Sequence, residues 1–368
     1  MTVTEIAATL VRIPSVNPDG DPGTQKTGEA GCAEWLAGFL AAAGAEAELR
    51  EVFPGRPNVV ARFPSDRPGK PRILFAPHTD TVSVTGMTID PFSGEVRDGK
   101  LFGRGATDTK GPMASMLWAL REMGSSIPSL PFEIWFAGLM GEEAGQHGAK
   151  ALADQEEFAF VIAGEPTSMD VVHAHKGSAW LSLDASGVAV HASKPEAGVN
   201  AIYKMCDALD VIRREIIPMF GELRDPVLGH PTASVGTIQG GSKTNIVPDF
   251  CRANVDIRTI PGQDVSVIEK MIRAKVPDIG FSMVCSFPLF TDPGHPLIHA
   301  LQKCGAGLTG APWFCDAAVF ASKGCPAVAL GPGSIGQAHV CDEFILLDDL
   351  EKGAAFFLRF LHSLGAAA

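Results

Sequence analysis

Two short segments of the chain carry the residue types of a hydrolytic metal site. His78 and Asp80 follow one short apolar run, and the adjacent carboxylates Glu142 and Glu143 follow another. Imidazoles and carboxylates are the ligands that zinc and similar divalent ions take in proteins. Hydrolysis also needs a group that transfers protons without being a ligand. Glu142 and Glu143 can divide these tasks, because neighbours in a turn point in different directions.

Three further residues are candidate ligands. Glu165 follows a third apolar run, His339 follows a fourth, and Asp108 stands just ahead of a helical pattern, where the helix dipole favours a carboxylate. In open α/β sheets the carboxyl ends of the strands converge on one crevice, so these residues can meet although they are far apart in sequence. Two histidines and three carboxylates suit two metal ions that share a bridging group. Such a site can activate water at neutral pH and polarise a carbonyl.

Each of these motifs also has a simpler interpretation when it is taken alone. His78 and Asp80 could be a hydrogen-bonded pair at a strand end, and Glu142 with Glu143 could be a solvated turn. The glycine-containing segment 103–105 is a poor phosphate loop, because it lacks the lysine and serine spacing of a P-loop. The hydrolytic interpretation therefore depends on the coincidence of several motifs at strand ends.

The elements that must position these residues indicate the α/β class. Short, fully apolar strands alternate with helical patterns, which favours a catalytic domain with a mixed, largely parallel sheet flanked by helices. From about residue 176 the strands alternate apolar and polar residues, and their order with the helices is that of an inserted α+β (split β-α-β) domain. We expect residues 1–175 and 288–368 to form the catalytic domain and 176–287 the inserted lid and dimerisation domain. The predicted strands of the first domain include 73–76, 132–140, 158–163 and 326–330, and its predicted helices include 29–43, 113–123 and 145–153.

Composition limits the classes of partner. The 368 residues suit about two domains, and 46% of them are hydrophobic, as in globular proteins. A net charge of −12 repels phosphate backbones and argues against nucleic acid. No apolar run is long enough to cross a membrane, which argues against a membrane partner. The eight cysteines form no Cys-x-x-Cys pair and no signal peptide is visible, so we expect reduced thiols in the cytoplasm.

Taken together, the motifs resemble one enzyme family. The chain is similar to the di-zinc family of acetylornithine deacetylase, succinyl-diaminopimelate desuccinylase, aminoacylase and glutamate carboxypeptidase, and the matching motifs occur in the order of that family over nearly the whole chain. The segments that carry the resemblance are His78-Thr79-Asp80-Thr81-Val82, Gly103-Arg104-Gly105, Asp108-Thr109-Lys110-Gly111, Gly141-Glu142-Glu143, Gly164-Glu165-Pro166-Thr167 and Ala338-His339.

The resemblance implies a ligand set for two divalent ions, which we expect to be zinc, with cobalt able to substitute. Asp108 would bridge both ions. His78 and Glu165 would complete one site, and Glu143 and His339 the other.

The resemblance also implies roles for the neighbours of these ligands. Asp80 would hold the ring of His78 and fix its tautomer, and Glu142 would act first as general base and then as general acid. Members of the family carry a cis peptide bond directly after the bridging aspartate, which here is the bond between Asp108 and Thr109.

Three residues of the inserted domain match family positions that bind substrate. His191 resembles a histidine that reaches the active site of the partner subunit and stabilises the oxyanion, although it could instead be a surface histidine. Asn245 and Arg258 match positions that contact the carboxylate of the substrate, and the alternative for Arg258 is an exposed strand residue. Cys315 and Asp316 precede a helix and could line the pocket.

These features predict a hydrolase of linear amides that acts on a small N-acyl amino acid or peptide. The leading prediction is hydrolysis of N-acetylornithine to ornithine and acetate, a step of arginine biosynthesis. The alternatives are a succinyl-diaminopimelate desuccinylase, and a metal-dependent dipeptidase or glutamate carboxypeptidase. A metal-dependent binding protein that has lost catalysis is a third hypothesis, and intact Glu142, Asp108 and His191 argue against it. A homodimer through the inserted domain follows from the role of His191.

Overall fold

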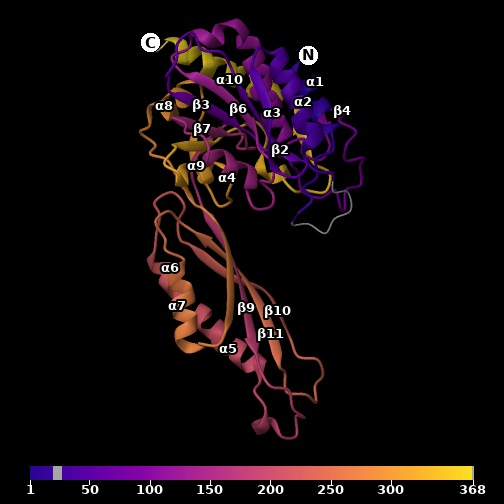
Figure 1. Cartoon of the computed structure of the whole chain (residues 1–368), viewed down its shortest axis with the longest axis vertical. Helices are drawn as coiled ribbons and strands as arrows, with labels where there is room; N and C mark the ends of the chain where they lie inside the picture. The colour runs from indigo at the N-terminus through magenta and orange to yellow at the C-terminus, as the bar shows by residue number, and fades with distance from the viewer. Residues whose placement is uncertain (20–26, 367–368) are drawn as a thin grey trace. The chain divides into compact units, whose positions relative to one another are not determined.

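A computed structural model describes residues 1–19 and 27–366 of the chain, which divide into two compact units (Figure 1). The first unit comprises Met1–His173, Phe290–Thr309 and Cys315–Ala368. The second comprises Ala174–Leu289 and Gly310–Phe314. The sequence prediction assigned 310–314 to the catalytic domain, whereas the contacts of this segment place it in the second unit.

A mixed sheet forms the centre of the first unit. Strand β3 (Arg72–Ala76) pairs in parallel with β6 (Glu133–Gly138) on one side and with β7 (Phe160–Ala163) on the other, and β15 (Ala327–Ala329) extends the parallel part beyond β7. On the opposite side of β6, strands β2 (Arg56–Arg62) and β1 (Glu46–Phe53) are antiparallel. Strands β8 (Val171–His175) and β13 (Leu289–Phe290) complete the order β1-β2-β6-β3-β7-β15-β8-β13. This arrangement confirms the predicted α/β class.

Helices flank this sheet, as predicted. Helix α3 (Lys110–Met123) packs against α1 (Val3–Val11) and against α10 (Leu347–Ala366), and α2 (Ala30–Ala42) packs against β1 and β2. Helix α4 (His147–Ala153) packs against α9 (Ala317–Ser322), and α8 (Pro296–Lys303) packs against α10. Apolar faces of these helices and of the strands form one continuous hydrophobic core. The core fixes the positions at which the strands end.

Three of the observed elements around the candidate site are shorter than predicted, whereas α3 begins at Lys110 rather than at residue 113. Strand β6 spans Glu133–Gly138 rather than 132–140, and β7 spans Phe160–Ala163 rather than 158–163. Helix α4 begins at His147 rather than at residue 145. The apolar residues at 139–140 are buried after the strand has ended, so hydrophobicity alone did not mark the boundary. A small sheet of β4 (Glu95–Arg97), β5 (Lys100–Phe102) and β16 (Phe344–Leu346) lies in the same unit.

The second unit is an antiparallel sheet with helices on one face (Figure 1). Its strand order is β10 (Thr232–Gly240), β11 (Phe250–Thr259), β9 (Gly177–Ser186) and β12 (Gly280–Ser286). Residues of β9 and β11 alternate between buried and exposed, and the buried ones pack against α5 (Ala201–Val211), α6 (Ile217–Glu222) and α7 (Ser266–Lys275). The opposite face is exposed at Trp180 and Val284. The elements follow the predicted order of strand, helix, strand, strand, helix, strand.

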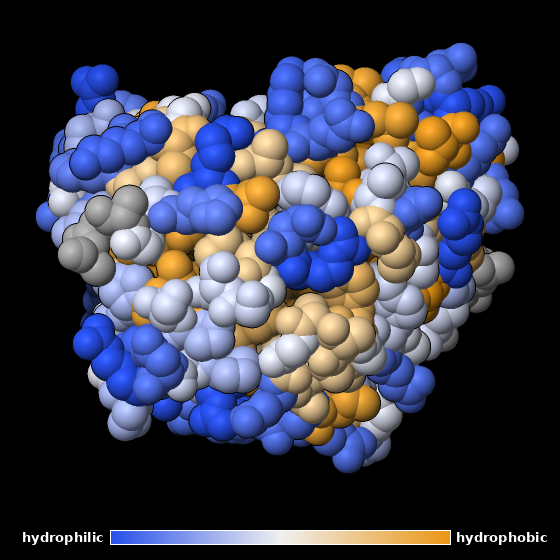
Figure 2. Space-filling view, turned by 90° about the horizontal axis from the view of Figure 1, so that it is seen from above, coloured by the Kyte–Doolittle hydropathy of each residue, from blue (hydrophilic) through white to orange (hydrophobic). Residues whose placement is uncertain are grey.

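None of the described helices is both long enough and apolar enough to span a bilayer. On the face seen in Figure 2, hydrophobic residues are interspersed with hydrophilic ones.

Candidate metal centre

Five side chains in the first unit form two groups that share one residue. His78, Asp108 and Glu165 form one group, and Asp108, Glu143 and His339 form the other. Within each group the possible ligand atoms all lie within 4.8 Å of one another. The structure therefore brings together the five residues that the sequence singled out as ligands, and Asp108 belongs to both groups.

The two oxygens of Asp108 face different histidines. Oδ1 lies 3.1 Å from Nε2 of His78, and Oδ2 lies 3.3 Å from Nε2 of His339. Nε2 of His339 is also 3.2 Å from Oε2 of Glu143. This geometry suits a carboxylate that bridges two ions. Oε1 of Glu143 is buried and has no hydrogen-bond partner among the described residues, so it remains available to an ion.

The strand ends explain why these residues meet. His78 and Glu165 follow the parallel neighbours β3 and β7, and Glu143 follows β6 on the other side of β3. Asp108 directly precedes α3, and His339 lies in the loop after β15 with a positive φ of 60°. The peptide bond between Asp108 and Thr109 is cis, as the resemblance implied.

Asp80 connects His78 to the loop that carries the two glutamates. Nδ1 of His78 lies 3.0 Å from the backbone oxygen of Asp80 and 3.4 Å from its Oδ1. The backbone N–H groups of Glu142 and Glu143 donate to the two carboxylate oxygens of Asp80, at 3.1 and 3.0 Å. Asp80 thus links the segment that contains His78 to the segment that contains Glu142 and Glu143.

A buried network behind Asp80 was not predicted. Asn17 donates to Oδ2 of Asp80 at 2.7 Å, and Nη2 of Arg56 donates to the side-chain oxygen of Asn17 at 3.3 Å. Arg56 also makes two hydrogen bonds to Glu29, at 2.8 and 2.6 Å, and Glu29 is fully buried. Burial raises the pKa of Glu29, and the hydrogen bond from Arg56 acts in the opposite direction. No spacing pattern in the sequence marks this network.

Glu343 was also missed as a functional residue. It is fully buried and accepts hydrogen bonds from the backbone N–H groups of Gly105, Thr107 and Asp108, at 2.9, 2.7 and 2.9 Å. Nη1 of Arg104 donates to the same carboxylate at 2.9 Å. Glu343 therefore holds the loop that presents Asp108. Its position four residues after His339 was the only sequence feature that could have drawn attention to it.

The electrostatics of the centre reflect many carboxylates in a small buried volume. Burial raises the pKa of Glu142 and of Glu165 well above the usual range, and neighbouring carboxylates raise both further. Burial lowers the pKa of His78, but hydrogen bonds to Asp108 and Asp80 outweigh it and raise this pKa well above its ordinary value. Hydrogen bonds to Asp108 and Glu143 raise the pKa of His339 to about 10. Cations at these donors would compete with protons for the same atoms.

Glu142 differs from its neighbour Glu143, because it belongs to neither ligand group of the described residues. Glu143, in contrast, contacts His339. The role of Glu142 in proton transfer stays a prediction.

The three predicted residues of the inserted domain belong to the second unit and to neither ligand group. His191 is exposed, and its Nδ1 lies 2.8 Å from Oγ of Ser193 and 3.2 Å from the backbone N–H of the same residue. Asn245 lies beside it, since the backbone oxygen of Asn245 accepts from Ala192 at 3.0 Å. Arg258 lies on β11 and donates to Asp256 at 2.9 Å.

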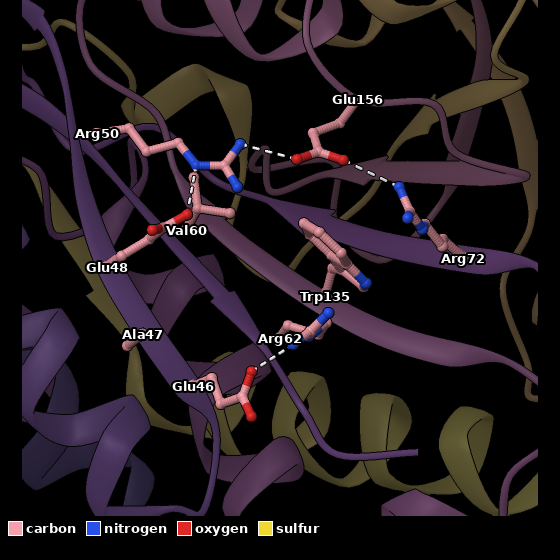
Figure 3. Close-up of a pocket in the computed structure, with 9 residues that line it drawn as sticks. All are labelled: Glu46, Ala47, Glu48, Arg50, Val60, Arg62, Arg72, Trp135 and Glu156. Atoms are coloured by element: carbon pink, nitrogen blue, oxygen red, sulfur yellow. Dashed lines mark hydrogen bonds and ion pairs between the residues drawn. The ribbon is translucent and has the colours of Figure 1, made fainter. Parts of the chain in front are cut away.

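A cavity of about 470 Å³ in the first unit lies over β1, β2 and β6 (Figure 3). Its three arginines all pair with carboxylates. Arg50 and Arg72 both reach Glu156, at 3.0 and 2.9 Å, and Arg62 pairs with Glu46 (Figure 3). The charges of this cavity are therefore compensated within the chain.

Comparison with known proteins identifies the family. The model of peptidase family M20/M25/M40 matches residues 74–363, which include all five candidate ligands. The chain belongs to this family. Membership of peptidase family M20/M25/M40 makes it a metal-dependent hydrolase and confirms the resemblance inferred from the motifs.

Individual relatives and solved structures align with this chain over nearly its full length. The acetylornithine deacetylase of Vibrio campbellii is 28% identical over 355 residues, which cover 92% of this chain and 91% of the relative. The crystal structure of aminopeptidase PepT from Bacillus cereus superposes with a TM-score of 0.78 at 24% identity, over 98% of each chain. An M20 family metallo-carboxypeptidase from Sulfolobus solfataricus gives a TM-score of 0.79 at 18% identity, over 100% of each chain. These two solved structures share the fold with this chain.

Proposed function

We propose that the chain is a di-metal amidohydrolase that removes the acyl group from an N-acyl amino acid, with N-acetylornithine as the leading substrate. The observation that carries the proposal is the arrangement of Asp108, whose two oxygens face separate ligand groups, while the buried carboxyl of Glu142 stays outside both. The similarity to the Vibrio deacetylase over 92% of the chain supports the acyl amino acid as substrate class.

In this proposal the donor set holds two divalent ions. Asp108 would bridge them, His78 and Glu165 would complete one site, and Glu143 and His339 the other. The unpartnered Oε1 of Glu143 and the buried imidazole and carboxylate donors fit such ions, and nitrogen with oxygen ligands suits zinc, with cobalt as a substitute. When bound, the two ions would polarise the amide carbonyl and acidify the attacking water.

The side chains of the protein supply the proton transfers and the alignment. Glu142 takes the proton of the attacking water and delivers it to the leaving nitrogen, which then departs as a free amine. The raised pKa of Glu142 suits both steps, since a carboxyl that binds a proton more tightly is a stronger base. Asp80 keeps Glu142 in place by accepting a hydrogen bond from the backbone N–H of Glu142, and it fixes the tautomer of His78 through Nδ1 of that ring.

The inserted domain supplies the remaining contacts in this proposal. Nε2 of His191 donates to the oxygen of the scissile carbonyl as negative charge develops on it, and acts in the active site of a partner subunit. Asn245 and Arg258 bind the carboxylate of the substrate, for which the planar guanidinium of Arg258 offers two parallel hydrogen bonds. Arg258 would exchange its contact with Asp256 for this one.

A homodimer through the second unit is part of the proposal. Strand β10 lies at the edge of its sheet and is exposed along most of its length. Val235 and Ile238 on this strand and Tyr203 on α5 expose 40%, 50% and 71% of their surfaces. An exposed edge strand with apolar residues is a template for pairing with another chain, and a second copy of this chain is the partner that His191 requires.

The cytoplasm is the proposed compartment. Buried cysteines such as Cys32, Cys251 and Cys325 are free thiols, which supports a reducing environment.

A substrate panel tests the proposed function. The purified protein, supplied with zinc or cobalt, is assayed against N-acetylornithine, N-succinyl-diaminopimelate, dipeptides and peptides with a carboxyl-terminal glutamate. We expect the highest kcat/KM for N-acetylornithine. A higher value for the succinylated substrate would favour the desuccinylase, and a higher value for a peptide would favour the dipeptidase or carboxypeptidase. A metal-loaded protein without turnover on the entire panel would refute the proposal.

A further inference from the structure

Asp316 is a buried carboxylate that has no part in the proposed mechanism and, unlike Glu29 and Glu343, has no hydrogen-bond partner among the described residues. It exposes only 1% of its surface, and the lack of a partner applies to both of its oxygens. Gln146 is also 1% exposed, and both polar atoms of its amide lack a partner in the same sense. Buried polar groups are nearly always hydrogen-bonded in proteins, so two such groups together indicate a missing ligand.

The two residues lie next to the catalytic loop. Gln146 ends the loop that begins at Gly141 and carries Glu142, and the backbone N–H of Gln146 donates to the carbonyl of Gly141 at 2.8 Å. Asp316 directly precedes α9, which packs against α4, the helix that starts immediately after Gln146. The amide of Gln146 is close enough to lower the pKa of Asp316, but the two side chains do not meet in hydrogen-bonding geometry.

The packing of α9 against α4 brings Asp316 beside the loop that carries Glu142, and the electrostatics agree with this position. The negative charge of Asp316 raises the pKa of Glu142 and that of Glu165, after the larger effect of burial on each. Burial raises the pKa of Asp316 itself to about 7, with His78 acting against this rise and Asp80 adding to it. A carboxylate in this position therefore adds negative charge to a site that is already rich in it.

No ion pair within the described part of the chain reaches Asp316. The charges of His78 and Lys150 lower its pKa, but Lys150, on the adjacent helix α4, donates its Nζ to the backbone oxygen of Gly145 at 2.8 Å. Since an unpaired buried charge is costly, a cation from outside the protein would stabilise the ionised form of Asp316.

We propose that Asp316, assisted by the side-chain oxygen of Gln146, binds a primary ammonium group of the substrate and thereby selects for substrates that carry one. This inference rests on the proposed hydrolytic function of the metal centre and adds the specificity of that site. Two kinds of substrate carry such a group near a scissile amide. One is an acylated diamino acid, through the amine of its side chain, and the other is a peptide, through its amino terminus.

The test compares substrates that differ only in this ammonium. N-acetylornithine and N-acetylnorleucine have side chains of the same length, in which a methyl group replaces the ammonium. A dipeptide and the same dipeptide with an acetylated amino terminus form the second pair. We measure kcat/KM for both pairs with the metal-loaded wild type and with Asp316→Asn. The control variant is Asp154→Asn, because Asp154 is an exposed carboxylate at the other end of α4 that pairs with Lys323 at 2.7 Å.

We expect the wild type to prefer the cationic member of at least one pair. In Asp316→Asn, kcat/KM for that member should fall about 10- to 100-fold, the range of a charge-assisted hydrogen bond, while the neutral member changes by less than about threefold. Metal content should stay the same, and Asp154→Asn should alter neither pair. The pair that responds identifies the source of the ammonium.

Other outcomes separate the two proposals. Equal losses on the cationic and neutral members would show that Asp316 only supports the fold of the loop, and would overturn this inference while leaving the hydrolase intact. A wild type that cleaves no amide would refute the proposed function itself. If Asp316→Asn does not fold, inhibition of the wild type decides, since ornithine must inhibit more strongly than norleucine. Equal inhibition by the two would overturn the role of Asp316.

Discussion

Oε1 of Glu343 accepts a hydrogen bond from the backbone N–H of Asp108 at 2.9 Å, so the residue proposed to bridge two ions is held from behind by a second carboxylate. The same carboxylate also accepts from Gly105 and Thr107. The full set of bonds uses both oxygens as acceptors, which the ionised carboxylate provides. Burial raises the pKa of Glu343, and the backbone N–H groups with Arg104 oppose that rise.

Replacement of Glu343 by glutamine tests this support. The amide nitrogen of glutamine would face backbone N–H groups that need an acceptor, so the loop of Asp108 should loosen. We expect metal affinity to fall about 10- to 100-fold, as is usual when groups that orient ligands are changed. Competition with a chromophoric chelator measures the affinity. The matched control is Glu95→Gln, an exposed glutamate on β4 of the same small sheet, which should leave the affinity unchanged. Unaltered metal binding in Glu343→Gln would show that the Asp108 loop does not need this carboxylate.

The division between Glu142 and Glu143 gives a second prediction. Glu142→Gln should lower kcat by about 10²- to 10⁴-fold, because the proton transfers are lost, while the metal content stays that of the wild type. Glu143→Gln should lose metal as well as activity, since Glu143 contacts His339 within the ligand group. Elemental analysis and steady-state kinetics on the same samples distinguish the two. Near-normal turnover in Glu142→Gln would exclude it as the base.

The buried ion pair of Arg56 and Glu29 gives a third prediction. Arg56→Met leaves the fully buried Glu29 without its cation and should destabilise the first unit by about 3–5 kcal/mol. The double variant Arg56→Met/Glu29→Leu should recover most of this loss, because no unpaired charge remains. Urea unfolding measures the stability of the single and the double variant, through the transition that belongs to the first unit. Additive losses in the double variant would mean that the two residues act separately.

His175 gives a fourth prediction, on pH. Burial lowers the pKa of this histidine to about 4 in the folded chain, against about 6.5 in an unfolded chain. Below about pH 6.5 the unfolded state therefore binds a proton that the folded state does not, and stability should fall between about pH 6.5 and pH 4, by at most about 3 kcal/mol. His175→Gln should lose less stability than the wild type between pH 7 and pH 5 in thermal unfolding. The exposed His299→Gln serves as control and should behave as the wild type does. Identical pH profiles for wild type and His175→Gln would contradict the assignment.

The fifth prediction concerns the proposed action of His191 across a dimer. His191→Ala and Glu142→Gln should each be nearly inactive alone. In a mixed dimer one active site carries both defects and the other carries neither, so random exchange of subunits should restore about a quarter of wild-type activity. Activity is measured after the two variants are unfolded together, refolded and reloaded with metal. Activity that stays at the level of the separate variants would place His191 in its own subunit or outside catalysis.

The sequence predicted the class of fold and the five side chains that the structure groups together, but not what holds them. His78, Glu143 and Glu165 follow apolar strands, and strand ends converge in any sheet of this type, so residue type and position were sufficient. Glu343 accepts from the backbone N–H of Asp108, and Asn17 donates to the carboxylate of Asp80. Such contacts depend on the path of the chain rather than on any spacing in the sequence.

The limits of strands and units were also beyond the sequence. Leu139 and Met140 are as buried as the strand that precedes them, so hydrophobicity did not mark the residue at which the regular strand ends and only an isolated bridge from Leu139 to His78 remains. The segment Gly310–Phe314 joins the second unit through contacts far away in sequence, which no local pattern records.

The two points of the first unit between which the second unit is inserted lie side by side. The backbone N–H of Thr291 donates to the carbonyl of His173 at 2.8 Å, so the chain departs and returns at hydrogen-bonded neighbours on adjacent strands. A short glycine-containing turn could join these two points without moving either strand. All of the second unit except Gly310–Phe314 is thus one continuous insertion, and exchange of 174–289 between relatives would move the residues proposed to bind substrate and to pair subunits as one heritable piece.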